Sequence, residues 1–349
     1  MAKDISSQRD PFDDYLIKVE NYIQSSQWRD ICGISGEDLK VLPLARGEYN
    51  LNYLLRGKEK SLVFRVNMGT QIDRDDQIVY EFKTLKLLQN SGVTPIPCYV
   101  DDSRNLLDRG ISIMEYLPGR SLDYKSDLRD AARVFSTIHQ LPVAEAENHL
   151  IRETEPLTMI FTECKKLLST YFKSPLADPD IRNFLMEVID WANSYREKEQ
   201  YFLADPWFCI VNTEVNSGNF IVNPFKQTTH LIDWEMARWG DPSTDLCHFY
   251  SPLTTLWKTS FRFSPEGLSC FLTEYKKNLR SDHLRNSLEE RLHFKFPFVL
   301  LRGISWSAMG WVAYQTDYEG MRDEHTWRTL QRYMNIDFIR SLFSPLMQP

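Results

Sequence analysis

The chain has 349 residues, of which 42% are hydrophobic and 26% are charged. These fractions are typical of a folded globular protein, and they exclude a disordered, collagen-like or low-complexity chain. The 41 basic and 48 acidic residues give a net charge of −7, and no block of Lys and Arg stands out. We therefore expect no sequence-independent binding to nucleic acid. The length favours two domains, or one large protein with two lobes.

The sequence shows no sign of a membrane or secretory protein. No stretch approaches the roughly 18 consecutive apolar residues of a membrane-spanning helix, and the first residues lack the apolar region of a signal peptide. The six cysteines are scattered without a CxxC pair, which is typical of reduced, mostly buried thiols. We expect a cytoplasmic protein without membrane contact.

The N-terminal third predicts an antiparallel sheet with one inserted helix. Apolar residues at helical spacing predict a first helix over 12–27. Strands are expected at 40–45, 50–57, 61–67, 96–101 and 111–117, with a helix over 75–90 between the third and fourth. This sheet region covers roughly residues 36–117.

The remainder of the chain is predicted to be mainly helical. The expected helices span 127–140, 154–172, 177–196, 243–258, 265–279, 285–316 and 322–342. A short β-hairpin, 220–223 and 229–234, is the exception. The turn-rich stretch 117–123 suggests a boundary between a small lobe, 1–116, and a larger helical lobe, 117–349. The fold class is therefore α+β.

The densest polar cluster lies in residues 212–222 and 231–246. Glu214 and Asn219 precede one strand of the expected hairpin, and Asp233 follows the other. A hairpin brings such strand ends together, so we expect these three side chains to converge. Oxygen ligands of this kind suit Mg²⁺, which binds one or two protein groups plus substrate phosphates. The remaining carboxylate would orient or deprotonate a hydroxyl group.

These two segments resemble the aminoglycoside phosphotransferase/choline kinase-like family, relatives of the protein kinases. The family pattern is His-Gly-Asp-x-x-x-x-Asn, then Ile-Asp-Trp-Glu, Gly-Asp-Pro and Asp-Leu. This chain has Asn212-Thr213-Glu214 and Asn219, followed by Ile232-Asp233-Trp234-Glu235, Gly240-Asp241-Pro242 and Asp245-Leu246. The second half matches closely, whereas Asn212 and Glu214 replace the usual His and Asp.

The N-terminal half carries the same resemblance. Residues 45–55 are similar to the family's nucleotide loop, which implies nucleotide contact by Gly47, Tyr49 and Asn50. Arg65 occupies the position of a phosphate-binding cation, and Glu81 resembles the helix glutamate that pairs with it. Residues 113–119 are similar to the hinge that binds adenine, with Met114, the carbonyl of Glu115 and the N–H of Leu117 in contact.

The resemblance implies a bilobal protein kinase-like fold and a kinase activity that uses ATP and Mg²⁺. The γ-phosphoryl group would pass to a hydroxyl of a small polar acceptor of the aminoglycoside, amino alcohol or sugar type. Asn219 and Asp233 would hold the metal, and Glu214 would act on the acceptor. Asn212 is expected to hold the loop. Asp241 and Asp245 are expected to be scaffold residues that cap the helix at 243–258, in a segment that the family uses to stabilise the catalytic loop. The oligomeric state, monomer or homodimer, stays open.

Some alternatives also stay open. Glu214 is one methylene longer than Asp, and a displacement of about 1 Å can cost roughly a hundredfold in rate, so a nucleotide-binding pseudokinase is the second interpretation. A protein kinase is disfavoured because Asp-Phe-Gly and Ala-Pro-Glu are both missing. Trp306, Trp311 and Tyr314 are interpreted as helix packing, or else as an aromatic wall for a cationic acceptor.

Overall fold

The computed structural model describes residues 11–25, 27–47, 49–316 and 324–348. The chain divides into two compact units. The first consists of Met1–Gly119, Val143–His149 and His230–Met236, and the second of Arg120–Pro142, Leu150–Thr229 and Ala237–Pro349. No helix in the described ranges is both long and apolar enough to cross a membrane.

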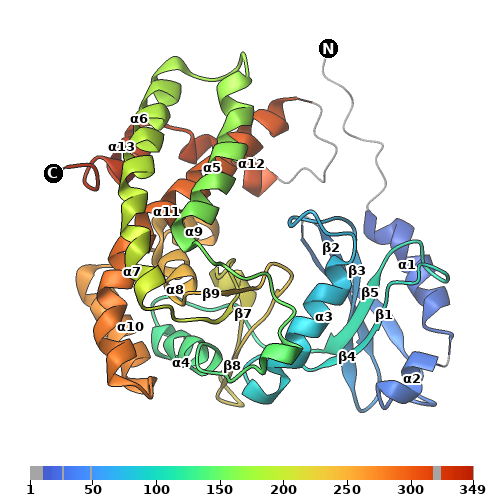
Figure 1. Ribbon diagram of the computed structural model, residues 1–349. Coiled ribbons are helices and arrows are strands. Elements are labelled where there is room, and N and C mark those ends of the chain that lie inside the picture. Colours follow the sequence, from blue (N-terminus) through green and yellow to red (C-terminus); the bar gives the residue numbers. More distant parts are fainter. Residues whose placement is uncertain (1–10, 26, 48, 317–323, 349) are drawn as a thin grey trace. The chain divides into compact units, whose positions relative to one another are not determined.

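The first unit is built on a five-stranded antiparallel sheet with the strand order β1-β2-β3-β5-β4 (Figure 1). Its strands are β1 (Lys40–Arg46), β2 (Asn50–Arg56), β3 (Ser61–Asn67), β4 (Pro97–Asp101) and β5 (Ile111–Glu115). The helix α3 (Gln77–Leu88) is inserted between β3 and β4 and packs against β4 and β5. All five strands and the inserted helix confirm the sequence-based prediction.

The N-terminal helix is shorter than predicted. Instead of one helix over 12–27, the structure has α1 (Pro11–Tyr22) and α2 (Gln27–Ile31). The Tyr22 hydroxyl donates a hydrogen bond of 2.7 Å to Asp101 on β4, and this contact fixes the end of α1 on the sheet.

The second unit is mainly helical, as predicted. Its helices are α4 (Leu128–Ile138), α5 (Pro156–Lys173), α6 (Pro179–Tyr195), α7 (Glu199–Ala204), α8 (Ser243–Tyr250), α9 (Pro252–Lys258), α10 (Pro265–Asn278), α11 (Asp282–Gln315), α12 (Glu324–Tyr333) and α13 (Ile336–Phe343). Two short strand pairs complete the elements. They are β6 (Cys209–Val211) with β9 (Arg238–Gly240), and β7 (Phe220–Asn223) with β8 (Thr228–Leu231).

Two predicted helices are each divided in the structure. The stretch 243–258 forms α8 and α9 because Pro252 cannot continue a helix but is well suited to begin one. The Ser251 hydroxyl accepts a hydrogen bond from the Leu253 N–H and caps α9. The stretch 322–342 forms α12 and α13, with Asn335 as the N-cap of α13, and residues 322 and 323 lie outside the described part.

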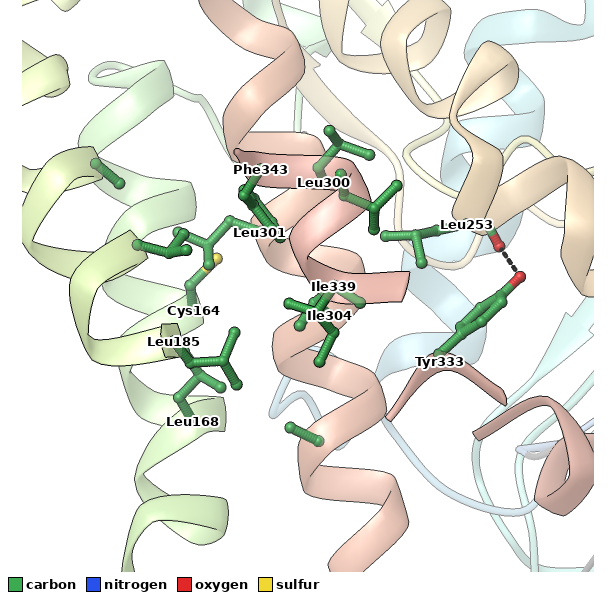
Figure 2. Packing of buried hydrophobic residues seen from close by; sticks show 14 of the residues in the cluster. Cys164, Leu168, Leu185, Leu253, Leu300, Leu301, Ile304, Tyr333, Ile339 and Phe343 are labelled. Carbon is green, nitrogen blue, oxygen red and sulfur yellow. Dashed lines mark hydrogen bonds between the residues drawn. The ribbon is translucent and has the colours of Figure 1, made fainter. Parts of the chain in front are cut away.

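The long helix α11 organises the core of the second unit. Figure 2 shows Leu300, Leu301 and Ile304 of α11 packed among buried side chains of neighbouring helices. The Tyr333 hydroxyl donates a hydrogen bond of 2.7 Å to the Leu253 carbonyl in this core. Each fully buried Leu or Ile contributes about 1.5–3 kcal/mol, so α11 is a rigid support for α8, which packs against it.

Candidate active site

Arg65 is the central cation of the first unit. It lies on β3, is only 6% exposed, and donates from Nη1 to Glu81 on α3 at 2.5 Å. The same nitrogen lies 3.1 Å from Oδ1 of Asp233, and Nε donates to Asn52 on β2 at 3.0 Å. The ion pair between Arg65 and Glu81 that the family resemblance implied is therefore present, and the guanidinium also binds Asp233.

These contacts change the pKa of the charged groups. Burial alone would lower the pKa of Arg65, but the charges of Glu81 and Asp233 outweigh it and raise that pKa. Burial raises the pKa of Glu81, against the attraction of Arg65. The Asp233 side chain is 27% exposed, whereas that of Glu81 is 2% exposed. Asp233 is thus the carboxylate of this pair that a ligand can approach.

A second buried carboxyl, Glu235, lies beside this ion pair. Its Oε2 accepts hydrogen bonds from the side-chain amides of Asn50 at 2.6 Å and Gln77 at 2.7 Å. Burial, followed by the charges of Asp233 and Glu81, raises the pKa of Glu235 to about 8. If all three carboxyl groups ionised, they would outnumber the one guanidinium, so this cluster favours a bound cation or proton.

The predicted nucleotide loop lies at the turn between β1 and β2. The Gly47 N–H donates to the Asn50 carbonyl at 2.9 Å and closes the turn. A Cβ at Gly47 would meet only backbone atoms of Asn50, at 3.8 and 4.0 Å, so the chain itself leaves room there for a side chain. The Tyr49 carbonyl accepts from the Met68 N–H at 2.7 Å. Asn50 is buried, and its side-chain amide donates a hydrogen bond to Glu235. Within the chain, the Asn50 side chain therefore positions the Glu235 carboxyl group.

The predicted hinge begins at the end of β5. Met114 is buried, and Glu115 is the last residue of the strand. The Glu115 N–H donates to the Ile96 carbonyl at 2.9 Å, and Leu117 follows two residues later. These bonds fix the strand end, and contact of Met114, Glu115 and Leu117 with adenine stays a prediction.

Asp245 of the second unit holds the loop that follows β6. It lies on α8, has no exposed surface, and accepts hydrogen bonds from the backbone N–H groups of Asn212 at 2.8 Å and Thr213 at 2.7 Å. His139 lies 3.3 Å from the same carboxylate. Asp245 lies inside α8, so its predicted role as a helix cap is wrong, whereas the two hydrogen bonds agree with the expectation that this segment stabilises the loop. Asp241 does bind the first residue of α8, accepting from the Ser243 N–H at 3.0 Å.

Side chains of the loop fix its shape further. The Asn212 carbonyl oxygen Oδ1 accepts from the Glu214 N–H at 3.1 Å, which supports the predicted loop-holding role of Asn212. The Asn219 amide donates to the Glu214 carbonyl at 2.7 Å. The side chains of Glu214 and Asn219 are partly exposed. Because Asp233 belongs to the first unit, its predicted convergence with Glu214 and Asn219 stays a prediction.

Two residues that the sequence did not indicate lie near Glu214. Arg302 on α11 is an ion partner of Glu163 on α5 at 3.0 Å, and the charge of Glu214 also helps to raise its pKa against burial. Burial, followed by the charge of Arg302, lowers the pKa of His248 on α8 to about 4. No local motif marks Arg302 or His248, because each lies in an ordinary helical sequence far from the loop along the chain.

The backbone is strained at one residue of each predicted segment. Asp233 has φ +66° and Thr213 has φ +74°. Left-handed backbone is costly for residues other than Gly, above all for a β-branched residue such as Thr. Strain of about 1–3 kcal/mol per residue persists where the surrounding structure enforces it, and it is concentrated at functional sites. Asp73, Arg104 and Gln227 also have a positive φ, so this backbone conformation is consistent with a functional role of the two segments but does not single them out.

The three aromatic residues of α11 pack against different partners. Trp306 meets Trp257 edge to face, Trp311 meets Tyr171, and Tyr314 stacks on Trp327. These contacts support the helix-packing interpretation.

The residues present fit a magnesium ion better than a zinc ion. No group of three His, Cys, Asp or Glu side chains suited to a metal was found within the described ranges. Mg²⁺ does not need such a group, since it usually binds one or two protein oxygens and takes its other ligands from phosphate and water. The partly exposed carboxylate of Asp233 matches that requirement.

Comparison with known proteins agrees with this geometry. The model of the phosphotransferase enzyme family matches residues 40–275, more than half of the chain. No curated protein sequence matches.

Three solved structures illustrate the shared fold. An ethanolamine kinase of Plasmodium vivax has a TM-score of 0.65 at 13% identity, over 95% of this chain and 90% of that one. A choline kinase of Cryptosporidium parvum has a TM-score of 0.57 at 13% identity, over 96% of this chain and 98% of that one. A spectinomycin phosphotransferase, solved with ADP and spectinomycin, has a TM-score of 0.57 at 12% identity, over 89% of this chain and 93% of that one. At these identities the likeness establishes the kinase-like fold.

Proposed function

The chain belongs to the phosphotransferase enzyme family, and from this premise we propose that it transfers the γ-phosphoryl group of ATP to a hydroxyl of a small polar molecule. The acceptor class that we propose is the one that the family resemblance implies, an aminoglycoside, amino alcohol or sugar.

The observation that carries this proposal is the position of Arg65. A buried guanidinium is held at 2.5 Å by buried Glu81 and at 3.1 Å by partly exposed Asp233. Charge stabilisation and positioning supply most of the rate in phosphoryl transfer. A fixed cation next to an accessible carboxylate is suited to hold phosphate oxygens and a metal ion together.

The proposed roles rest on the motif together with the contacts that each residue makes within its own unit. Arg65 would contact the phosphates, and Glu235 would hold Asn50 and Gln77 so that the turn at Gly47 keeps its shape. Asn219 and Asp233 would hold Mg²⁺, which neutralises charge on the phosphates when bound. Glu214, fixed by Asn212 and Asn219, would orient or deprotonate the acceptor hydroxyl.

A thermal melt with ATP tests nucleotide and metal binding first. A ligand at about a hundred times its Kd adds about 2.7 kcal/mol, which raises the melting temperature by a few degrees in a chain of this size. We expect the shift with Mg²⁺ and a smaller one with EDTA. No shift in either condition would contradict the proposal.

The variant Asp233→Ala tests the metal ligand directly. It should keep its fold, lose the Mg²⁺-dependent part of the shift and lose turnover. Asp73→Ala is a matched control, because Asp73 is an exposed aspartate of the same unit that also has a left-handed backbone, φ +53°. Unchanged phosphorylation by Asp233→Ala would overturn the metal assignment.

A nucleotide-binding pseudokinase is the second candidate function. It is favoured by the side chain of Glu214, which is one methylene longer than the usual Asp and places its carboxylate differently in the loop. Glu214→Asp and Glu214→Gln separate the two functions in a screen of ethanolamine, choline and spectinomycin. An enzyme adapted to Glu214 loses rate in both variants, whereas a pseudokinase shows no turnover in the parent chain.

A further inference from the structure

Three buried side chains form a hydrogen-bonded row that ends at the loop before Glu214. Tyr275 lies on α10, His139 directly follows α4, and Asp245 lies on α8. The Tyr275 hydroxyl is 3.0 Å from Nδ1 of His139, and Nε2 of the same ring is 3.3 Å from Oδ2 of Asp245. None of the three residues is more than 2% exposed, so bulk water does not compete for these contacts.

The two outer members of the row decide where the proton of the His139 ring lies. A neutral imidazole donates from one ring nitrogen and accepts at the other, whereas a carboxylate can only accept. Asp245 accepts from two backbone N–H groups, so Nε2 must carry the proton that binds this carboxylate. Nδ1 then needs a donor. Burial raises the pKa of Tyr275 well above its ordinary value, so its hydroxyl keeps the proton that Nδ1 accepts.

We propose that Tyr275 and His139 are positioning residues for the loop before Glu214. The Tyr275 hydroxyl keeps the ring proton of His139 on Nε2, and the Nε2–H group orients the Asp245 carboxylate. This role rests on the proposed function, in which that loop presents Glu214 to the acceptor.

The loop needs this support because its backbone is strained. Thr213 has φ +74°, which is unfavourable for a β-branched residue. Asp245 accepts from the N–H of Thr213 at 2.7 Å and from the N–H of Asn212 at 2.8 Å. A ring proton on Nδ1 of His139 would instead turn the Nε2 lone pair toward Asp245, and two acceptors would then face each other without a proton.

Helix packing holds the row in place. Helix α10 packs against α4 (Figure 1), and Gln140 joins their ends. Its amide donates to the Asn278 carbonyl at 3.0 Å, and its oxygen accepts from the Arg280 N–H at 2.7 Å. The His139 ring stacks on Phe135 with 5.7 Å between the ring centroids. The ring therefore has a fixed place, and what Tyr275 decides is which nitrogen carries the proton.

The position of the ring proton is measured in the parent chain, without a substitution that affects folding. NMR of protein labelled with 15N-histidine distinguishes a protonated from an unprotonated ring nitrogen, and the signals missing from His139→Gln identify His139. We expect a protonated Nε2 and an unprotonated Nδ1. Protonation of Nδ1, alone or together with Nε2, would overturn the proposal.

Tyr275→Phe removes the hydroxyl group alone. The two backbone N–H groups that Asp245 binds should exchange with deuterium about fivefold faster, the factor that corresponds to one ordinary hydrogen bond. Tyr171→Phe is the matched control, because Tyr171 is 1% exposed and its hydroxyl accepts a hydrogen bond of 3.0 Å from the Asp178 N–H, between α5 and α6. It should leave the exchange of the two loop amides unchanged. Equal exchange in both variants would refute the role of Tyr275.

His139→Gln distinguishes this row from packing alone. A glutamine amide donates to a carboxylate without a second ring nitrogen that needs a donor. In this variant, adding Tyr275→Phe should change the exchange of the loop amides no further. Independent packing effects would add instead, and additive effects of the two substitutions would therefore contradict the proposal.

Turnover decides whether the position of the loop matters for catalysis. Tyr275→Phe should lower kcat about tenfold, within the roughly hundredfold that a displacement of 1 Å can cost. The KM for ATP should stay unchanged, because the row belongs to the second unit and Arg65 to the first. An unchanged kcat would overturn the positioning role. If the parent chain shows no turnover in the acceptor screen, the proposed function fails, whereas the ring proton and the exchange rates still decide whether the row holds the loop.

Discussion

Asn50 and Glu235 are joined by a hydrogen bond of 2.6 Å although 185 positions separate them in the sequence. Gln77 donates to the same Glu235 oxygen at 2.7 Å. Asn50 follows the turn at Gly47, Gln77 begins α3, and Glu235 lies two residues after Asp233. One buried carboxyl therefore fixes three segments of the first unit that the proposed function assigns to nucleotide and metal.

Replacing Gln77 with Leu tests the importance of this shared oxygen. Glu235 would keep Asn50 but lose a hydrogen bond in a buried place, which costs about 1–3 kcal/mol of unfolding free energy. ATP should bind more weakly because Glu235 no longer holds the start of α3. Urea unfolding and calorimetric titration measure the two effects. Gln89→Leu, at an exposed position just after α3, should change neither, and equal behaviour of the two variants would refute the role of Gln77.

Replacing Arg65 with Met tests the buried ion pair. Loss of one partner of a buried pair typically costs 3–5 kcal/mol, because the remaining charge stays buried. Arg65→Lys should retain more stability but still weaken ATP binding, since a lysine ammonium cannot reproduce the planar, multiple contacts of a guanidinium. Chemical unfolding and ATP affinity are the measurements.

Arg74→Met is the matched surface control for Arg65. Arg74 pairs with Asp76 at 2.8 Å, with side chains 36% and 50% exposed. Exposed pairs contribute only about 0–1 kcal/mol, so this variant should stay close to the parent chain. A larger loss at Arg74 than at Arg65 would contradict the assignment of Arg65 as the central cation.

The elements of the first unit could be predicted because each has a local signal. Strand alternation and turn residues predict β2 and β3 to within one residue of their observed bounds. In the second unit, Pro252 is a sequence signal for the division of α8 from α9 that the single predicted helix did not use. The strands β6 and β9 were missed because each has three residues. Three residues are too few to show the alternation of apolar and polar residues that marks a strand, and β6 and β9 lie far apart in the sequence, so no turn signal joins them.

The partners of the site residues could be predicted only in part. The pair of Arg65 with Glu81 followed from the family resemblance, whereas the contacts of Glu235 with Asn50 and Gln77 did not. Arg302 likewise carries no signal, because a helical Arg near Glu214 is recognisable only after α11 has folded beside the loop. The motif therefore indicates which segments form the candidate site, and tertiary packing determines which other residues contact these segments.

Replacing Thr213 with Gly should separate stability from activity. A glycine adopts φ +74° without strain, so we expect the unfolding free energy to rise by about 1 kcal/mol. Turnover should fall because the loop beside Glu214 is less rigid. Gln227→Gly is the matched variant, with φ +53° in the β7–β8 turn, and it should gain stability without losing turnover. A loss of stability at Thr213 would refute the strain.

The pH dependence of stability tests the surroundings of His248. Its pKa is about 4 in the folded chain, below the ordinary value near 6.5. Between these values the unfolded chain binds a proton that the folded chain does not. The stabilisation is therefore complete above pH 6.5, is lost as the pH falls toward 4, and amounts to about 3 kcal/mol.

The variant His248→Gln removes this titration while keeping a polar side chain that cannot take up a proton. Its stability should change less than that of the parent chain between pH 6.5 and 4, as measured by urea unfolding at several pH values. His293→Gln, at an exposed position of α11, should retain the dependence of the parent chain. If both variants follow the parent curve, His248 is not held neutral by burial and Arg302, and another group sets the acid sensitivity of the second unit.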